Sequence, residues 1–224
     1  MEIRTRILDA AARVYAEHGF RGATTRRIAH AAGVNEVTLF RTFGSKAALI
    51  DEAIRWRSAA PHGAPLAHTL PEEPAHPERE LTAWATEHLG ELRRSRALIR
   101  QAMSELEERP TSAPCVTQGW ANADSQLRGY IRRLAKADLI AAGRDDALAA
   151  GAMLMAALFS DAMGRDMMPE LFPPADRAAA LYVRLFLRAV DCRTPARAGA
   201  RTPRVGTRSG PRGRARSLSS KPGS

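Results

Sequence analysis

The side chains whose types and spacing indicate a specific chemistry lie between residues 24 and 43, in the segment TTRRIAHAAGVNEVTLFRTF. Its hydroxyls, guanidinium groups, amide and carboxylate are all groups that recognise a polar ligand through hydrogen bonds. Nowhere in the sequence does a Ser/His/Asp order, a phosphate-cradling glycine loop, a metal-ligand spacing or a carboxylate pair stand out. The pattern favours recognition over catalysis, so we expect no enzyme activity, no cofactor and no metal.

Two short helices joined by a tight turn are expected to position these side chains. Thr24 is a suitable N-cap for the first helix, and Ile28 and Ala32 follow at the spacing of a buried helical face. Gly33 stands where the helix needs a residue in the left-handed conformation, and Asn35 is placed to cap the second helix. This arrangement predicts a helix-turn-helix, whose second helix enters the major groove of DNA.

The chain resembles the tetracycline-repressor-like (TetR/AcrR) family of bacterial transcriptional regulators over about its first quarter. The matching segments are TRILDAA at 5–11, GFRGATT at 19–25, IAHAAGV at 28–34, TLF at 38–40 and FGSKAAL at 43–49. The resemblance implies a DNA-binding head, an all-helical body that binds a ligand, and a homodimer. It also implies a repressor that a small molecule, here unknown, releases from a palindromic operator in double-stranded DNA.

The resemblance also implies roles for residues around the first helix of the motif. Thr24 and Thr25 are expected to face a phosphate at the amino end of that helix. Arg26 is expected to reach a base edge or a phosphate, and guanine O6 and N7 are the natural bidentate partners of an arginine. Lys46, beyond the motif, suits a phosphate.

The second helix of the motif is expected to present its exposed side chains to the bases. Asn35 caps the helix, Glu36 can accept from cytosine N4, and Val37 and Thr38 can touch thymine methyl groups. The exposed set comprises Asn35, Glu36, Val37, Thr38, Arg41 and Thr42.

Two positions depart from the pattern of the family. Phe40 stands where the family usually has tyrosine, so it lacks the hydroxyl that would bond a phosphate. Packing against the sugar-phosphate backbone, or burial in the core, is then its expected role. Thr42 stands where histidine is common, which leaves a phosphate contact there open.

Charge and proline content divide the chain into four segments. Residues 1–60 hold ten basic and six acidic side chains, and we expect them to form the head, with a helix over 2–17 and a connecting helix over 46–58. Residues 61–79 carry five prolines and are expected to form a loop, in which three histidines are solvated rather than metal-bound. Residues 80–192 are expected to form the body, and the whole stretch 61–192 is mildly acidic, with fifteen basic and eighteen acidic side chains.

The body is expected to be all-α because none of its segments shows the alternation of a strand. Helices are predicted over 80–94, 97–108, 116–137, 145–163 and 175–190, which makes about nine helices in the whole chain. The helices expected to surround one cavity carry candidate ligand contacts, although plain core is the more common role of such residues: Trp84, His88, Met103, Trp120 and Tyr130.

The segment 145–163 is apolar on nearly every side and therefore needs partners all around it. With 175–190 it is expected to pair with the same helices of a second subunit across a two-fold axis, as the resemblance implies. Burial inside one subunit is the alternative. The residues expected near this joint are Leu154, Leu158, Val183 and Leu187.

Residues 193–224 hold nine basic and no acidic side chains and almost no large apolar ones, which predicts a disordered tail. Such a tail can attract DNA phosphates, so a ligand-independent architectural DNA-binding protein is the alternative function. The start of the chain has no secretory apolar region, and no apolar run was expected to be of membrane-spanning length. With Cys115 and Cys192 expected as free thiols, these features predict a cytoplasmic protein without contact to a membrane.

Overall fold

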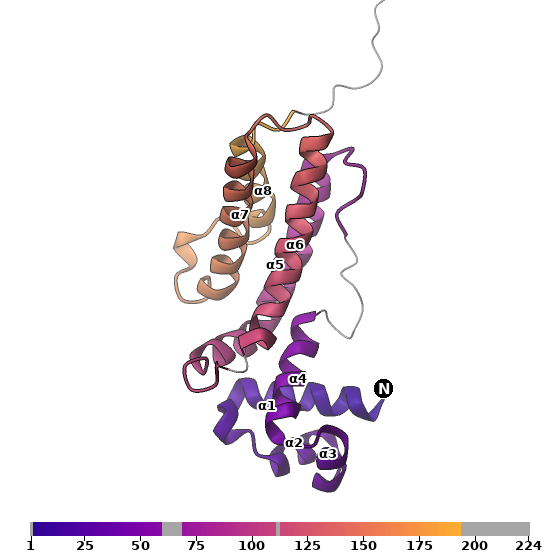
Figure 1. Ribbon diagram of the computed structural model, residues 1–224. Helices are drawn as coiled ribbons and strands as arrows, with labels where there is room; N and C mark the ends of the chain where they lie inside the picture. Colours follow the sequence, from indigo (N-terminus) through magenta and orange to yellow (C-terminus); the bar gives the residue numbers. More distant parts are fainter. Residues whose placement is uncertain (1, 60–68, 111–112, 194–224) are drawn as a thin grey trace, which may run out of the picture.

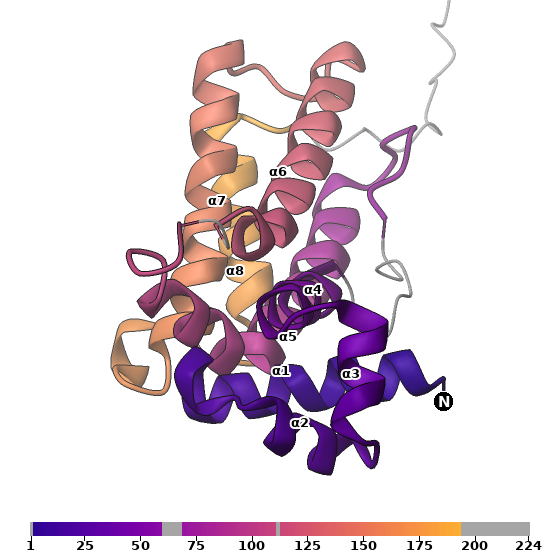
Figure 2. The same cartoon turned by 60° about the horizontal axis from the view of Figure 1, so that its bottom comes forward.

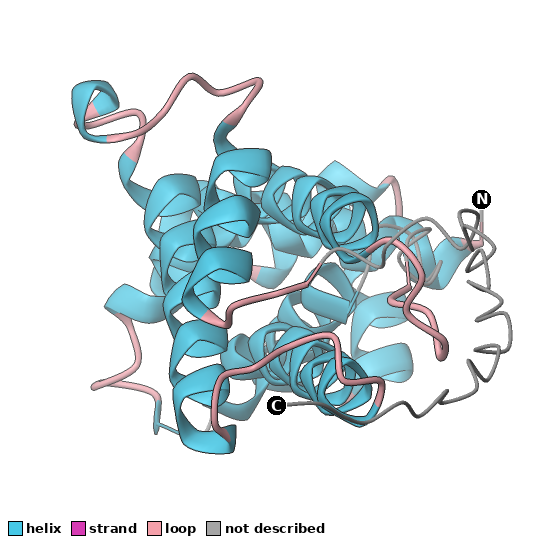
Figure 3. Ribbon diagram, turned by 90° about the horizontal axis from the view of Figure 1, so that it is seen from above, coloured by secondary structure: helices cyan, strands magenta, loops and turns pink. Residues whose placement is uncertain are grey.

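The computed structural model describes residues 2–59, 69–110 and 113–193, and helices make up the regular structure in these ranges (Figures 1 and 3). The prediction of an all-α fold is confirmed. The described helices are α1 (Ile3–Gly22), α2 (Thr25–Ala32), α3 (Glu36–Phe43), α4 (Lys46–Ala59), α5 (Pro77–Ser104), α6 (Ala113–Lys136), α7 (Arg144–Gly164), the 3-10 helix η3 (Pro169–Leu171) and α8 (Ala178–Ala189). The predicted disordered tail lies outside the described residues, except for Arg193.

One long helix, α5, replaces the two helices that were predicted over 80–94 and 97–108. Ser95, in the predicted break, is buried, and its hydroxyl donates to Glu91 one turn earlier at 3.0 Å. The helix also begins earlier than expected, at Pro77, whose missing N–H costs nothing in the first turn. A carboxylate oxygen of Glu80 accepts from the backbone N–H groups of Ala75 and His76 at 3.0 and 2.7 Å, which fixes this start.

The start of α5 shortens the predicted proline-rich loop. Residues 61–68 of that loop, with His62 and His68, lie outside the described residues. Residues 69–76 are non-helical, as expected, and the helix has already begun at Pro77.

The head consists of α1 to α4, packed around a core that also includes part of α5 (Figure 2). Ile7, Ile28, Leu39 and Ile50 come from the four head helices and are all fully or almost fully buried. Leu98 of α5 is buried in the same cluster, as is Ala102. Since α5 supplies side chains to this core, the head does not end structurally at residue 60, and a movement of α5 necessarily changes the packing of the head.

The body consists of α5 to α8 around a second core, in which the side chains of α7 and α8 are central. Leu154 and Leu158 of α7 are 3% and 0% exposed, and Val183 of α8 is 0% exposed. These three side chains are enclosed by their own subunit and do not themselves form an outer surface of it, so the position of the joint on α7 and α8 stays a prediction. Leu187 is half-buried and packs on the same core.

By length and composition α7 could cross a membrane, contrary to the expectation that no apolar run was long enough. Half of its most apolar window is buried inside the body, however, and it carries Asp161 with 0% exposure. Oxygens of Asp161 accept hydrogen bonds from Arg93 at 2.7 Å, from Tyr182 at 2.9 Å and from Arg165 at 2.9 Å. These contacts to α5 and α8 identify α7 as the central helix of a packed body.

The head meets the body at the end of α5, where Glu105 receives hydrogen bonds from two residues of α1. The Tyr15 hydroxyl donates to one carboxylate oxygen at 2.8 Å, and the Phe20 backbone N–H donates to the other at 2.8 Å. Gly19 lies between Tyr15 and Phe20 in the sequence and has a φ of 65°. A Cβ at Gly19 would lie 2.8 Å from Oε1 of Glu105. Glycine is therefore needed both for the backbone conformation and for the close approach.

Candidate nucleic-acid interface

Helices α2 and α3 lie at the end of the head farthest from the body (Figure 1). The predicted cap of α2 is present, because the Thr24 side chain accepts from the backbone N–H of Arg27 at 3.2 Å. Gly33 has a φ of 64°, the left-handed conformation that the turn was expected to need. Both ends of α2 are thus fixed by the residues that the sequence suggested.

The orientation of α3 follows from its cap and its buried side. The Asn35 side chain accepts from the Thr38 backbone N–H at 2.8 Å, as expected for an N-cap. Leu39 and Phe43 are buried in the head core, while Val37 is 73% exposed on the opposite side of the helix. The helix therefore offers the Val37 side to a ligand outside the molecule.

A hydrogen bond connects the two helices of the motif. The Thr25 hydroxyl donates to Glu36 at 2.6 Å, which joins the first residue of α2 to the first residue of α3. Sequence reasoning placed Thr25 against a phosphate and Glu36 against cytosine, and it did not anticipate that the two side chains bind one another. One oxygen of Glu36 remains for a further contact, so its role toward cytosine stays a prediction.

Two arginines are the cations best placed to reach DNA. Arg26 on α2 and Arg41 on α3 are exposed, and neither makes a hydrogen bond or an ion pair within the described part of the chain. Arg27 differs, because its guanidinium donates to the Gly22 carbonyl at 2.7 Å. Arg26 and Arg41 are therefore available to a phosphate or a guanine edge.

Lys46 has a structural partner that was not predicted. Its ammonium donates to the Phe20 carbonyl at 2.9 Å and lies 4.2 Å from the centre of the Phe20 ring. The cap of α4 lies beside it, with the Ser45 hydroxyl accepting from the Ala48 N–H at 3.1 Å. Since an ammonium has three donors, a phosphate contact by Lys46 is compatible with this bond.

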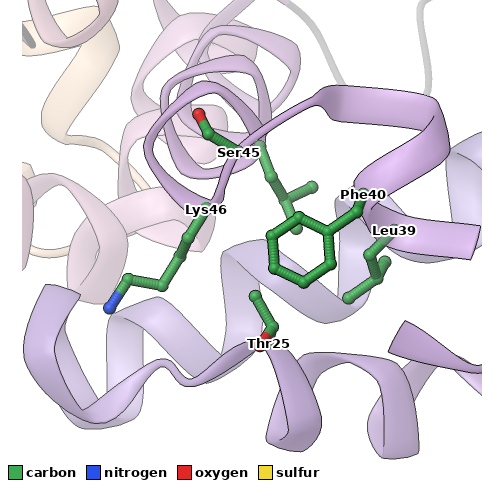
Figure 4. A pocket seen from close by; sticks show the side chains of 6 residues that line it. Thr25, Leu39, Phe40, Ser45 and Lys46 are labelled. Atoms are coloured by element: carbon green, nitrogen blue, oxygen red, sulfur yellow. The ribbon is translucent and has the colours of Figure 1, made fainter. Parts of the chain in front are cut away.

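Phe40 is 49% exposed, so burial in the core, one of its two expected roles, does not apply. Its ring covers one side of a shallow hollow between the motif and α4 (Figure 4). Thr25, Leu39, Ser45, Lys46 and Leu49 line the rest of it. Packing on the sugar-phosphate backbone therefore remains as the expected role of Phe40.

Thr42 uses its hydroxyl within the helix. It donates to the Thr38 carbonyl one turn earlier at 2.7 Å. The hydroxyl proton is therefore not available for a phosphate unless this bond breaks.

The five candidate ligand contacts of the body separate into two groups. Trp84, His88 and Tyr130 are buried, whereas Met103 and Trp120 are 46% and 36% exposed. The Trp120 ring packs edge-on against Phe159, with ring centres 5.3 Å apart. Met103 lies near the end of α5, two residues before the joint to the head, and its role as a ligand contact stays a prediction.

His88 of α5 has a buried ring nitrogen without a hydrogen-bond partner. Its ring stacks on Trp84 with centres 5.4 Å apart, and its Nε2 makes no hydrogen bond in the structure. Burial lowers the pKa of His88 to about 4, against a small opposing effect of Glu91, so the ring is neutral at pH 7. A buried nitrogen without a partner costs free energy, and a group that formed a hydrogen bond with it would reduce this cost.

Tyr130 and Asp161 have partners and different roles. The Tyr130 hydroxyl donates to Glu80 at 2.5 Å, which joins α6 to the start of α5. Burial alone would raise the pKa of Asp161, but hydrogen bonds from Arg165, Arg93 and Tyr182 outweigh it and lower the pKa. The sequence analysis did not identify the hydrogen bonds around Asp161 or the role of Glu105. The position of Asp161 inside an apolar segment was a signal for the hydrogen bonds around it.

No group of three or more His, Cys, Asp or Glu side chains arranged to hold a metal ion occurs in the part of the chain that the structure describes. Cys192 is a free thiol there, half-buried after α8.

Comparison with known proteins gives matches to the head and to the whole fold. Residues 7–53 match the family model described as bacterial regulatory proteins, tetR family. Over 52 residues the chain is 46% identical to the HTH-type transcriptional repressor KstR2 of Rhodococcus jostii, a match that covers 23% of this chain and 26% of that protein. Over 54 residues it is 41% identical to the uncharacterized HTH-type transcriptional regulator YvkB of Bacillus subtilis, covering 24% of this chain and 29% of that one. The match thus spans little more than a quarter of each curated relative.

Solved structures extend the likeness of fold beyond the head. A putative TetR-family transcriptional regulator from Mesorhizobium loti has a TM-score of 0.65 at 19% identity, covering 83% of this chain and 95% of that one. GusR of Salmonella enterica has a TM-score of 0.64 at 22% identity, covering 85% and 96%. Residues 7–53 are thus similar in sequence to the tetR family of bacterial regulatory proteins, and the chain as a whole shares the all-helical fold of these two structures.

Proposed function

We propose that the protein is a DNA-binding transcriptional regulator, acting in the cytoplasm as a homodimeric repressor that a small molecule releases from a palindromic operator. The single observation that supports it best is the exposed side of α3. The caps at Thr24 and Asn35 hold this helix at the outer end of the head, and Arg26 and Arg41 are exposed on the motif. This is the arrangement in which a recognition helix enters the major groove.

A dimer is supported by apolar side chains that the subunit leaves exposed on α7 and α8. Met153 is 74% exposed and Leu185 is 61% exposed. Ala149, Ala152 and Ala156 share the exposed side of α7 with Met153, at one-turn spacing. Small residues allow a close approach of a second helix, and two heads on adjacent half-sites need recognition helices about 34–36 Å apart.

A response to a ligand is supported by the position of α5. Its first half carries Trp84 and His88 in the body core, and its second half carries Leu98 in the head core. A ligand that gives His88 a partner acts on the same rigid helix on which the head packs. Coupling between two such sites is typically about 1–3 kcal/mol.

The test begins with selection of binding sites from random double-stranded DNA by the full-length protein. We expect enrichment of a sequence with two-fold symmetry, retarded in a gel as a complex of two subunits. Arg26→Ala should weaken binding to this sequence more than binding to random DNA, whereas Arg13→Ala, an exposed arginine on α1, should change neither. Binding without any enriched sequence would instead support the ligand-independent architectural protein.

A screen for the effector follows on the selected operator. Compounds that raise the melting temperature of the protein are tested for release of DNA. The proposal expects at least one stabilising compound to weaken operator binding, and it expects His88→Leu to abolish that effect while DNA binding without the compound persists. Compounds that bind the body but never alter DNA affinity would contradict ligand control.

A further inference from the structure

The outward side of α3 is unusually apolar for a surface that meets DNA. Val37 is 73% exposed and Phe40 is 49% exposed, and they stand on adjacent turns of the helix. Among the residues of α3, only Arg41 provides an exposed long polar side chain. A recognition helix of this composition offers few groups that read base edges by hydrogen bonds.

The short polar side chains of α3 are already bonded within the head. The Thr38 hydroxyl donates to the Asn35 amide oxygen at 2.8 Å, and the Thr42 hydroxyl donates to the Thr38 carbonyl at 2.7 Å. One oxygen of Glu36 accepts the Thr25 hydroxyl at 2.6 Å. Neither threonine of α3 can donate to a base acceptor without breaking an internal bond, so hydrogen-bond readout by these side chains carries a cost.

Phe40 shares the exposed side of α3 with Val37 and borders the hollow that Ser45, Lys46 and Leu49 also line, at the edge of this side nearest to α4. Figure 4 shows its ring lying over the hollow toward Thr25, on the side of the motif that faces α4. This position suits the sugar-phosphate backbone at the edge of the groove. Val37 then remains as the central apolar side chain of α3 that meets the floor of the groove.

From these contacts we infer that Val37 reads the C5-methyl group of thymine, and that the operator half-site carries a thymine opposite it. The inference rests on the proposed function and specifies which chemical group of the operator is recognised. The thymine methyl is the apolar group that base edges display in the major groove. Against a polar base edge, Val37 would remove donors and acceptors from water and return no hydrogen bond.

Uracil is the probe for this contact, because it lacks the methyl group but pairs with adenine and keeps every hydrogen-bonding group of thymine. Deoxyuridine replaces each thymidine of the selected operator in turn, at the same position of both half-sites, and affinity is measured by fluorescence anisotropy. We expect the substitution at one or two positions to weaken binding about three- to fivefold for each methyl group lost. The other positions should change little.

The Val37→Ala variant assigns the contact to its side chain. Val37 is mostly exposed, so this variant should keep the melting temperature of the parent protein. It should bind the thymine and uracil operators with nearly equal affinity, because the partner of the methyl group is gone. Arg13→Ala, whose side chain is 62% exposed on α1, is the matched control and should keep the full preference for thymine.

The possible results separate the inference from the proposed function. If no sequence is enriched from random DNA, the proposed function fails and the inference fails with it. If an operator is selected but uracil binds as well as thymine at every position, only the inference is overturned. A preference for thymine that persists in Val37→Ala would likewise overturn it, since another residue would then read the methyl group.

Discussion

The hydroxyl of Tyr15, in α1 of the head, donates a 2.8 Å hydrogen bond to Glu105, the residue that ends α5 of the body. The same carboxylate also holds the Phe20 N–H, so one side chain fixes α1 to α5 at two points. Arg109 lies beside it, pairs with Asp51 of α4 at 2.8 Å and stacks on the Phe20 ring at 3.7 Å. The head is therefore held in one orientation by bonds that sequence patterns did not indicate.

Tyr15→Phe should destabilise the protein by about 1–2 kcal/mol, because it leaves an oxygen of Glu105 without its donor in a half-buried position. Urea denaturation monitored by circular dichroism measures the loss. Glu108→Gln is the control, since the Glu108 side chain is 68% exposed and its partner Arg21 is 92% exposed. Equal stability of Tyr15→Phe and the parent protein would show that the bond does not contribute.

Asp161→Asn should cost about 3–5 kcal/mol of stability, because Arg93 and Arg165 would lose the carboxylate that compensates their charges inside the body. Asp166→Asn provides the comparison, as Asp166 pairs with Arg100 at 2.6 Å but is 36% exposed. Its removal should have a much smaller effect. A similar loss in the two variants would mean that burial of Asp161 does not set its importance.

Acidification should destabilise the protein through His88 between about pH 6.5 and pH 4. Burial lowers the pKa of His88 to about 4 in the folded state, so in this range the unfolded chain binds a proton that the folded protein excludes. Stability is therefore unaffected above the unfolded pKa and falls as the pH drops, by about 3 kcal/mol at most. His88→Leu should lose this part of the pH dependence, as shown by urea denaturation at several pH values.

His30 is exposed on α2, so His30→Gln provides a control for the loss of a histidine side chain outside the body core. At pH 7 we also expect His88→Leu to be at least as stable as the parent protein, since it removes a buried nitrogen without a partner. Strong destabilisation at pH 7 would show that His88 serves the packing of the body and is not kept for a ligand.

Met153→Glu and Leu185→Glu should yield folded monomers that bind the operator weakly. Both side chains are exposed in the subunit, so a charge there is tolerated by a monomer and must be desolvated in a dimer formed through this side. Sedimentation velocity gives the oligomeric state and circular dichroism the helical content. If both variants remain dimeric, the joint lies elsewhere.

Leu158→Glu is expected to behave differently from these two variants. Leu158 is 0% exposed inside its own subunit, so a charge at this position should unfold the body rather than separate two subunits. Loss of helical content together with loss of the dimer would distinguish it from Met153→Glu. A folded monomer of Leu158→Glu would instead show that α7 contacts a second subunit through the side that carries Leu158.

Local signals in the sequence were sufficient for the helix-turn-helix. Thr24 and Asn35 cap helices through atoms three residues away, and Gly33 adopts its conformation because of its own missing side chain. The buried sides of α2 and α3 follow from helical spacing alone. These features depend on neighbours in the sequence, which is why residues 24–43 could be interpreted without a structure.

The tertiary structure decided the features that depend on residues far apart in the chain. Spacing marked Leu154, Leu158 and Val183 as apolar positions of buried helices, but it could not tell a core inside one subunit from a joint between two. The sequence predicted that a helix ends before Ser95. In the structure Ser95 is buried, and α5 continues through it. Glu105 and Tyr15 are 90 residues apart, and only the packing of α5 on α1 brings them within hydrogen-bonding distance.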